Sequence, residues 1–492
     1  MRVSLPALLI SLALAGCAAD APLPRPAAPV PATYPGGPAY APAPPSGAPP
    51  QPVPGWRDFL RDARLQLLVE LALHNNRDLR VAALNVEQVR AQHLLTHAAL
   101  APQVTLGAGV QRQSAESLSG THSGVARNLS TDVAAAWELD FFGRLHSLDR
   151  AALEQYLASA YAQQAARLLL VAQVADQYLV LRAADEQLAV TADLLSTSQA
   201  ALDLMVLQFK VGSVSELDLQ QARGTVELAQ AQLAAQQRDR AQAGNALALL
   251  VGQPLPADLP PGMDFDAPGL LADIPVGLPS DLLTRRPDIA QAEALLQAEH
   301  ADLAAARAAF FPRIGLTGSV GSAAPALSSL LGAGTGVWSF APTLLMPLFD
   351  RGANRANLAA ARVRQDIGVA QYEKAVQTAF REVADGLAAR GTYGPQLDAL
   401  QRYSATQQRR LELARRLYDN GIDNYLEVLT AQTDAYTARG SVVTARLNRL
   451  TSLVGLFRAL GGGWEEPAAA PQKTAAIGYA DRQATDNAAT TL

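Results

Sequence analysis

The sequence predicts a mainly α-helical protein with a β-barrel part, built by an internal duplication. Three observations support this fold class. Two stretches of about 180 residues repeat one another in the same order. Each repeat holds two segments in which apolar and polar residues alternate, a pattern typical of β-strands. Between residues 145 and 209 the chain has neither glycine nor proline, which predicts one helix about 100 Å long.

Three matches establish the duplication. Residues 78–106 align without a gap on residues 288–316, at an offset of 210 residues. The string Phe142-Gly143-Arg144 matches Phe349-Asp350-Arg351 at an offset of 207. Further on, residues 209–218 match residues 418–427 at an offset of 209. Because the matches keep their order, they indicate one duplicated structural unit.

The composition excludes several classes of function. The chain has 492 residues, and its 40 Lys and Arg are balanced by 45 Asp and Glu, which excludes a basic surface for nucleic acid. Charged residues make up 17% of the chain, against about 25% in ordinary soluble domains, so part of the surface is expected not to face bulk water. The single cysteine, Cys17, excludes a disulfide framework and a thiolate metal cluster within the chain.

The first residues are predicted to direct export. Residues 1–16 combine one positive charge, an apolar stretch and a small-residue ending, as secretory signal peptides do. The string Leu-Ala-Gly-Cys that ends at Cys17 resembles the bacterial lipobox, and the resemblance implies acyl chains such as palmitate on that cysteine. Ala18 after it favours the outer membrane. The alternative is a buried cysteine near an ordinary cleavage site.

The rest of the chain is predicted to divide into five parts. Residues 17–60 carry the cysteine and a proline-rich tether, of which residues 21–54 have a composition that cannot bury a core. Residues 61–252 and 280–463 are the two repeats, and residues 253–279, rich in Pro, Gly and Asp, connect them. Residues 464–492 are polar, lack apolar periodicity and are expected to be disordered.

Each repeat is predicted to hold a β-hairpin followed by a long helical hairpin. The first repeat opens with a helix that ends before Pro102. Its predicted helices and strands cover residues 65–100 (helix), 104–111 and 129–140 (strands around a polar loop), and 145–209 and 216–251 (helices). Those of the second repeat cover residues 314–320 and 337–349 (strands), and 353–417 and 425–460 (helices), with kinks expected at Gly368, Gly386, Gly391, Gly394 and Pro395.

The strands have the pattern of a transmembrane β-barrel, in which apolar residues alternate with small and charged ones. The alternative is a soluble hairpin packed on the helices. Such a hairpin usually buries its apolar face against a nearby sheet or helix, and this chain offers only helices on both sides, which counts against the alternative. Four strands cannot close a barrel, for which about eight are needed. We therefore expect the chain to oligomerise.

Several strings make the sequence similar to the TolC/OprM family of outer-membrane efflux channels, in its lipoprotein (NodT-like) branch. Together with the repeat, they extend the similarity over residues 60–463. The strings are Trp137–Arg144, Arg285–Ile289, Phe310–Ile314, Pro347–Asp350 and Gly421–Leu426.

The resemblance implies a homotrimer in which twelve strands, four from each chain, close one barrel in outer-membrane lipid. The long helices then continue it as an α-helical barrel across the periplasm. It also implies two partners, a periplasmic adaptor protein and an inner-membrane pump of the resistance-nodulation-division type. The implied function is a passive exit duct for drugs or other small molecules. The alternatives are a duct for protein secretion or metal efflux, or a periplasmic scaffold lipoprotein without a pore.

In the family, the turns of the two helical hairpins form the periplasmic tip, where the pore narrows. Tyr418 and Asp218 resemble a hydrogen-bonded pair that holds this gate closed, and Glu427 resembles a member of an acidic ring. The alternative is that Tyr418 and Asp218 only pack and cap helix ends. Asp423 and Thr430 depart from residues found in some members. Residues expected at the adaptor-contact tip are Val211, Gly212, Ser213, Asn420, Gly421 and Asp423.

Catalysis has no support in the sequence. The strings of a P-loop, a dinucleotide fingerprint, a nucleophile elbow and a zinc protease are absent, so we expect neither enzyme activity nor a cofactor. His93 and His97 stand four residues apart on a predicted helix, a spacing with which two histidines can share a metal. No third ligand is evident in the sequence. The pair is therefore predicted to be ordinary histidines of a helix surface.

Overall fold

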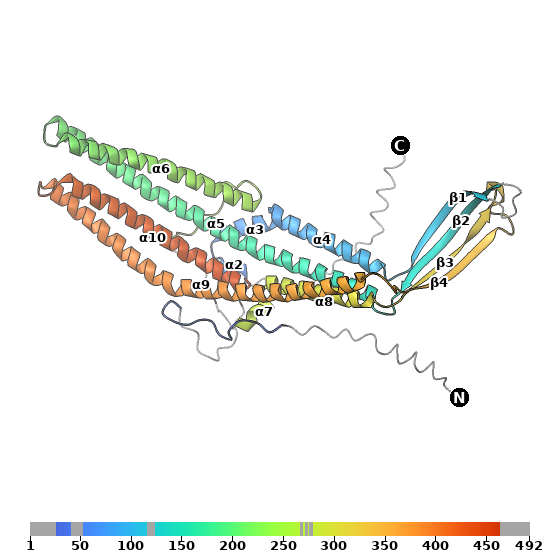
Figure 1. The fold of residues 1–492 in the computed structure, drawn as a ribbon. Coiled ribbons are helices and arrows are strands. Elements are labelled where there is room, and N and C mark those ends of the chain that lie inside the picture. The colour runs from blue at the N-terminus through green and yellow to red at the C-terminus, as the bar shows by residue number, and fades with distance from the viewer. Residues whose placement is uncertain are drawn as a thin grey trace. The chain divides into compact units, whose positions relative to one another are not determined.

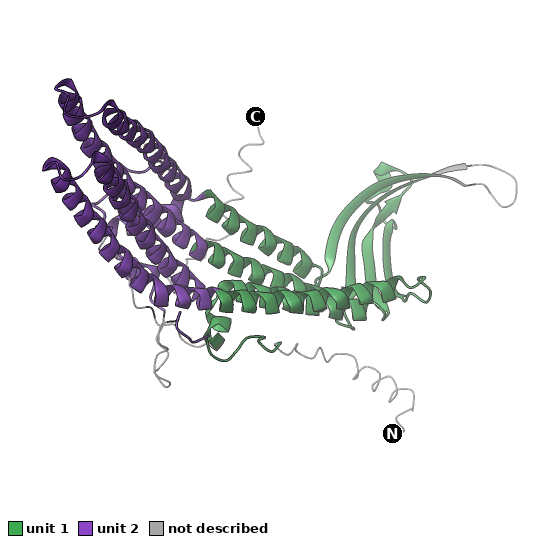
Figure 2. Ribbon diagram, turned by 60° about the vertical axis from the view of Figure 1, so that its left-hand side comes forward, with its two compact units in different colours: residues 1–34, 77–167, 278–381 green, residues 35–76, 168–277, 382–492 purple. Residues whose placement is uncertain are grey.

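The computed structural model describes residues 26–40, 53–115, 124–265, 269–270, 274 and 279–462. Cys17 lies outside these residues. Over them the chain is mostly helical, with one four-stranded sheet (Figure 1). Two compact units divide it (Figure 2): unit 1 comprises residues 1–34, 77–167 and 278–381, and unit 2 comprises residues 35–76, 168–277 and 382–492. Each unit draws on both repeats.

Unit 1 contains the antiparallel sheet. Its strands are β1 (Gln103–Ala115), β2 (Gly124–Leu139), β3 (Arg313–Ala324) and β4 (Gly336–Leu345), and they pair in the order β1-β2-β3-β4. The four predicted strands are therefore confirmed, but their ends differ. The first hairpin extends through part of the stretch expected to be a loop. β4 ends four residues earlier than expected, at Leu345, which pairs with the first residue of β3, Arg313.

The register sorts the side chains of the sheet onto two different faces. Residues paired across antiparallel strands project to the same side. One face joins Leu106 to Val133, Val133 to Val320, and Val320 to Trp338. The other face carries, at the neighbouring positions, Thr105, Ala134, Ser319 and Ser339.

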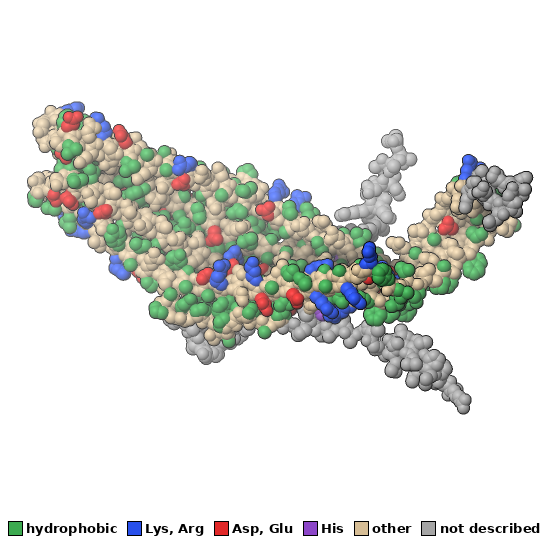
Figure 3. Space-filling model, viewed as in Figure 1, with side chains coloured by type: hydrophobic (Ala, Val, Ile, Leu, Met, Phe, Trp, Pro, Cys, Tyr) green, Lys and Arg blue, Asp and Glu red, His purple; other side chains and the backbone are tan. Residues whose placement is uncertain are grey.

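The apolar face of the sheet is open in this chain. Leu106 and Trp338 are each 79% exposed, and Phe340 is 62% exposed. Hydrophobic side chains are visible over the strands in the space-filling view (Figure 3). A contiguous exposed apolar surface of this kind marks a membrane or protein contact.

The two edges of the sheet are β1 and β4. Pro342 lies on β4 opposite Leu316. Because proline cannot donate to a ladder, its place on an outer strand agrees with the preference of proline for edges. The backbone groups on the outer sides of β1 and β4 are not paired by any strand within the described residues.

Short helices in unit 1 precede the hairpins. They are α4 (Arg77–Ala98) before β1, and η1 (Pro279–Asp281), α7 (Leu282–Arg285) and α8 (Pro287–Ala308) before β3. Pro287 occupies the first turn of α8, where its missing N–H costs nothing. A short 3-10 helix, η2 (Leu327–Ser329), lies between β3 and β4.

Two helices of 67 residues each, α5 (Arg144–Lys210) and α9 (Ala353–Asp419), pass from unit 1 into unit 2. Each is followed by a return helix in unit 2, α6 (Glu216–Val251) or α10 (Tyr425–Ala459). The long helices expected from the sequence are thus confirmed. α9 stays one helix through Pro395. At Gly386 a Cβ atom would come within 2.9 Å of the Leu456 side chain, so this glycine permits close packing of α9 on α10.

None of the described helices combines the length and the apolar composition that crossing a bilayer requires.

The helix expected over residues 65–100 was wrong in one respect, because it is two helices, α3 (Ala63–Asn75) and α4. They are separated by Asn76, whose backbone is extended, with φ −61° and ψ 130°. The Asn76 amide donates 2.9 Å to the Leu250 carbonyl oxygen of α6. Near it, a Cβ atom on Gly252 would lie 2.5 Å from the Asn75 carbonyl oxygen. The break between α3 and α4 therefore lies where Asn75 and Asn76 contact the end of α6.

A buried carboxylate, Asp62, organises the start of α3 in unit 2. It is 4% exposed and accepts four hydrogen bonds. One oxygen caps the helix through the N–H groups of Arg64 and Leu65, at 2.8 and 3.2 Å. The other accepts from the Tyr178 hydroxyl at 2.9 Å and the Met263 N–H at 3.1 Å. Burial, and then the charge of Asp62, raise the pKa of Tyr178, so its hydroxyl keeps the proton that it donates.

Asp62→Ala is expected to destabilise unit 2 by at least about 2 kcal/mol, because it removes a helix cap and leaves buried donors unpaired. The measurement is thermal unfolding of the purified protein followed by circular dichroism. Asp58→Ala is the control, since Asp58 is exposed four residues earlier. Equal melting temperatures for the two variants would show that the four bonds contribute nothing net.

Candidate functional site

The turns that join α5 to α6 and α9 to α10 lie at the same end of unit 2 (Figures 1 and 2). Both are built in the same way. Gly212 and Gly421 have positive φ, 77° and 70°, which glycine adopts without strain. After each glycine the chain closes on the helix: the Ser213 N–H donates 2.9 Å to the Gln208 carbonyl, and the Ile422 N–H donates 2.9 Å to the Leu417 carbonyl. This is the glycine-dependent termination that ends many helices.

The return helices begin with side-chain caps. Ser215 accepts from the Asp218 N–H through its hydroxyl, and the Asp218 carboxylate accepts from the Ser215 N–H at 3.3 Å and hydroxyl at 2.7 Å. At the equivalent place, Asn424 accepts from the Glu427 N–H at 3.2 Å. The duplicated strings therefore encode one turn twice, with a cap that locates the start of each return helix.

A shared core lies below the turns and joins the two helical hairpins. Its buried side chains come from α5, α6, α9 and α10, and they are Met205, Leu219, Ala222, Leu411, Ala414, Tyr425, Val428, Ala431 and Ala435. Tyr418 packs at its margin, with its ring centroid 5.4 Å from that of Tyr425. Both turns are consequently positioned by the same packing.

The Tyr418 hydroxyl links the two hairpins, but through a different partner from the one expected. It donates to Gln208 Oε1 at 3.2 Å and lies 3.6 Å from Met205 Sδ on α5. Asp218, the partner that the resemblance implies, instead closes the cap of α6. Asp218 still acts on Tyr418 through its charge: burial, then Asp218, then Asp419 raise the pKa of Tyr418, which keeps the phenol protonated as a donor.

Glu427 lies in an ion-pair network of the second hairpin. Arg410 on α9 lies 3.6 Å from Glu427 and 2.6 Å from Asp434, both on α10. The three side chains are about half exposed, so each contact contributes little by itself. Asp423, in the turn, accepts from the Asn424 N–H at 2.8 Å.

Both turns expose apolar side chains. The exposed fractions are 76% for Val211, 67% for Leu217, 73% for Ile422 and 55% for Leu426. The other residues expected at the tip, Gly212, Ser213, Asn420, Gly421 and Asp423, are exposed as well. The sequence did not identify Gln208 and Arg410 as residues of this site. Nothing in the local sequence pattern shows which residue on another helix each of them contacts.

A sheet with one open apolar face, two long helical hairpins and paired turns are the features of an outer-membrane efflux channel. The chain belongs to the outer membrane efflux protein family, which matches residues 68–253 and 278–462. The solved structures it resembles have the same channel fold. One is the open state of the MtrE outer membrane channel of Neisseria gonorrhoeae, at a TM-score of 0.80 and 37% identity, covering 90% of this chain and 98% of that one.

Curated relatives match over nearly the whole chain. The toluene efflux pump outer membrane protein TtgF of Pseudomonas putida is 44% identical over 477 residues, which are 96% of this chain and 99% of that protein. The outer membrane protein OprJ of Pseudomonas aeruginosa is 43% identical over 463 residues, 94% of this chain and 96% of that protein.

Proposed function

We propose that three copies of this chain form the outer-membrane exit duct of a tripartite efflux system for drugs or other small organic molecules. The open apolar face of the four-stranded sheet carries this proposal. A sheet that is apolar on one face and small or polar on the other fits between lipid and a water-filled lumen.

The edges of the sheet call for an oligomer, and the family resemblance supplies the number three. Backbone groups on the outer sides of β1 and β4 cost several kcal/mol each if they stay unpaired in lipid. Pairing of β1 of one copy with β4 of the next satisfies them. Three copies bring twelve strands, above the about eight that a closed barrel needs.

The two turns are the proposed place for the partners. At the end of unit 2 where Gly212 and Gly421 turn the chain, apolar surface is exposed by Val211, Leu217, Ile422 and Leu426. Exposed apolar patches mark protein contacts. We assign this surface to a periplasmic adaptor protein, which connects the channel to an inner-membrane pump of the resistance-nodulation-division type. Tyr418, with its partner Gln208, and Glu427 form the proposed gate beside it, and Asp218 supports the gate by capping α6 and by its charge near Tyr418.

A lipid anchor on Cys17 completes the proposed arrangement. The described residues 26–40 contain no helix or strand, whereas the end of the segment expected as tether forms a short helix, α2 (Trp56–Phe59), in which Phe59 is buried. Tyr34 in this segment stacks on Phe380, with ring centroids 5.3 Å apart, so the tether is held against unit 1. A tether attached in this way is compatible with an acylated Cys17 in the inner leaflet of the outer membrane.

The test is complementation. In a strain that lacks its own channel, this chain together with its adaptor and pump is expected to restore resistance to toluene and to antibiotics at least several-fold. The same purified trimer is expected to conduct ions in planar bilayers once its tip is opened. A pore-free protein that restores no resistance, despite normal amounts in the outer membrane, would contradict the proposal and favour a scaffold.

A further inference from the structure

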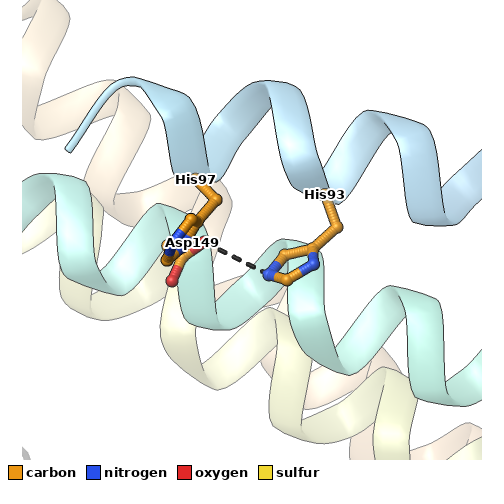
Figure 4. A group of neighbouring side chains, drawn as sticks. All are labelled: His93, His97 and Asp149. Carbon is orange, nitrogen blue, oxygen red and sulfur yellow. Dashed lines mark hydrogen bonds and ion pairs between the residues drawn. The ribbon is translucent and has the colours of Figure 1, made fainter. Parts of the chain in front are cut away.

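Two histidines and an aspartate meet in unit 1, at the base of the first β-hairpin (Figure 4). α4 supplies His93 and His97, four residues apart on one face, and α5 supplies Asp149. Asp149 Oδ1 lies 3.2 Å from His93 Nε2 and 3.2 Å from His97 Nδ1. A third candidate ligand, which was not evident in the sequence, is thus supplied by Asp149. Asp149 was missed because it stands 52 residues further along the chain.

The two nitrogen–oxygen distances of the cluster are compatible with a metal site. Zinc binds imidazole nitrogen and carboxylate oxygen at about 2.0–2.2 Å, so two ligands of a tetrahedron lie roughly 3.3–3.6 Å apart. Both nitrogen–oxygen distances in the cluster are close to this value, and one ligand atom from each of the three residues lies within 4.8 Å of the others.

The side chains are held in position, yet one side of the cluster is open. The His93 and Asp149 side chains are 18% and 19% exposed. The His93 ring stacks on Tyr156, with centroids 6.5 Å apart and planes 11° apart. His97 is 60% exposed, which leaves a path by which an ion and a water ligand can enter.

The fold itself does not demand this cluster, as the second repeat shows. At the offsets of the repeat, Leu303, Arg307 and Ala356 occupy the equivalent positions. Leu303 is buried in an apolar cluster with Ala306 and Ala361. At the position of His93 the second repeat thus packs hydrocarbon, and neither of its other two equivalents offers a metal ligand, so the fold does not require the two histidines and the carboxylate here.

We propose that His93, His97 and Asp149 bind one zinc ion per chain, with water as the fourth ligand. Two imidazoles and a carboxylate suit Zn²⁺, and three protein ligands with one open position are common for this ion. α4 ends shortly before β1 and α5 begins shortly after β2. The ion therefore joins the helix that enters the first hairpin to the helix that leaves it.

The experiment uses the full-length trimer in detergent, purified without a histidine tag and stripped with a chelator. Zinc is added, excess is removed on a desalting column, and the metal content is measured by mass spectrometry, while affinity is measured by calorimetry. We expect one zinc per chain. Cobalt in its place is expected to show the visible absorption of a tetrahedral ion.

Three variants and one matched control assign the ligands. His93→Ala, His97→Ala and Asp149→Asn are each expected to weaken zinc binding by more than the about 10–100-fold that loss of an outer-shell partner costs. His146→Ala is the control, because His146 also pairs with a carboxylate, Asp140 at 2.7 Å, but without a second histidine.

Thermal unfolding gives a second measurement. Saturating zinc is expected to raise the melting temperature of the parent and of His146→Ala, and to leave that of Asp149→Asn unchanged. Zinc that binds equally to all variants, or no zinc retained by the folded parent protein, would overturn the proposal and make the cluster an ordinary hydrogen-bonded contact between helices.

Discussion

Ala135→Arg is expected to prevent assembly of the protein in the outer membrane. Ala135 lies on the apolar face of β2, between Val104 and Gly318 in the register. An arginine on a lipid-facing position costs up to about 2–4 kcal/mol, depending on its depth in the bilayer, and a trimer carries this cost three times. A cost of that size is a large part of the total stability of a folded protein. The measurement is the amount of trimer in the outer-membrane fraction, which we expect to fall at least ten-fold.

The neighbouring residue provides a matched control. Ala136→Arg introduces the same side chain one position further along β2, on the face that carries Gln103 and Thr317. If this face lines the lumen, the variant assembles, and its main effect is a lower conductance for cations. Equal assembly of Ala135→Arg and Ala136→Arg would contradict contact of the apolar face with lipid.

Tyr418→Phe combined with Gln208→Ala is expected to open the periplasmic end of the channel. These residues form the hydrogen bond that joins α9 to α5, the two outgoing helices of the two hairpins. A neutral hydrogen bond contributes about 0.5–1.5 kcal/mol, so three copies around a trimer contribute about 3 kcal/mol. Losing them shifts a closed–open equilibrium about 100-fold toward the open state. Single-channel conductance should rise, and cells should become sensitive to large antibiotics.

Two further variants separate the gate from helix capping. Tyr425→Phe removes a hydroxyl from the neighbouring ring, one that makes no hydrogen bond among the described residues, and should leave conductance unchanged. Asp218→Ala should weaken the cap of α6 by about 1 kcal/mol without opening the channel. If Asp218→Ala opens it as much as the loss of Tyr418 and Gln208 does, the Tyr418–Asp218 bond implied by the resemblance forms in the assembled trimer.

Most of the helices and strands could be predicted from the sequence, because their signals are local. Along β1 to β4, apolar and polar residues alternate, a signal that depends only on residues two positions apart. When neighbouring strands pair, this alternation places the apolar side chains on one face of the sheet. Gly212 and Gly421 end helices through conformations that depend on one residue. The predicted bounds of α6, Glu216 and Val251, agree with the structure because Ser215 and Gly252 terminate it on either side.

The sequence by itself therefore determined the duplication, the strands and turns, and the family to which the chain belongs. Only the tertiary structure decided which side chains meet between helices. Tyr418 bonds Gln208, 210 residues away, and Asp149 joins His93 and His97 from another helix. Asn76 interrupts a helix where it reaches Leu250. These contacts depend on how long helices rotate and align when they pack, and hydrophobic periodicity specifies only which face is buried, not which polar groups become neighbours.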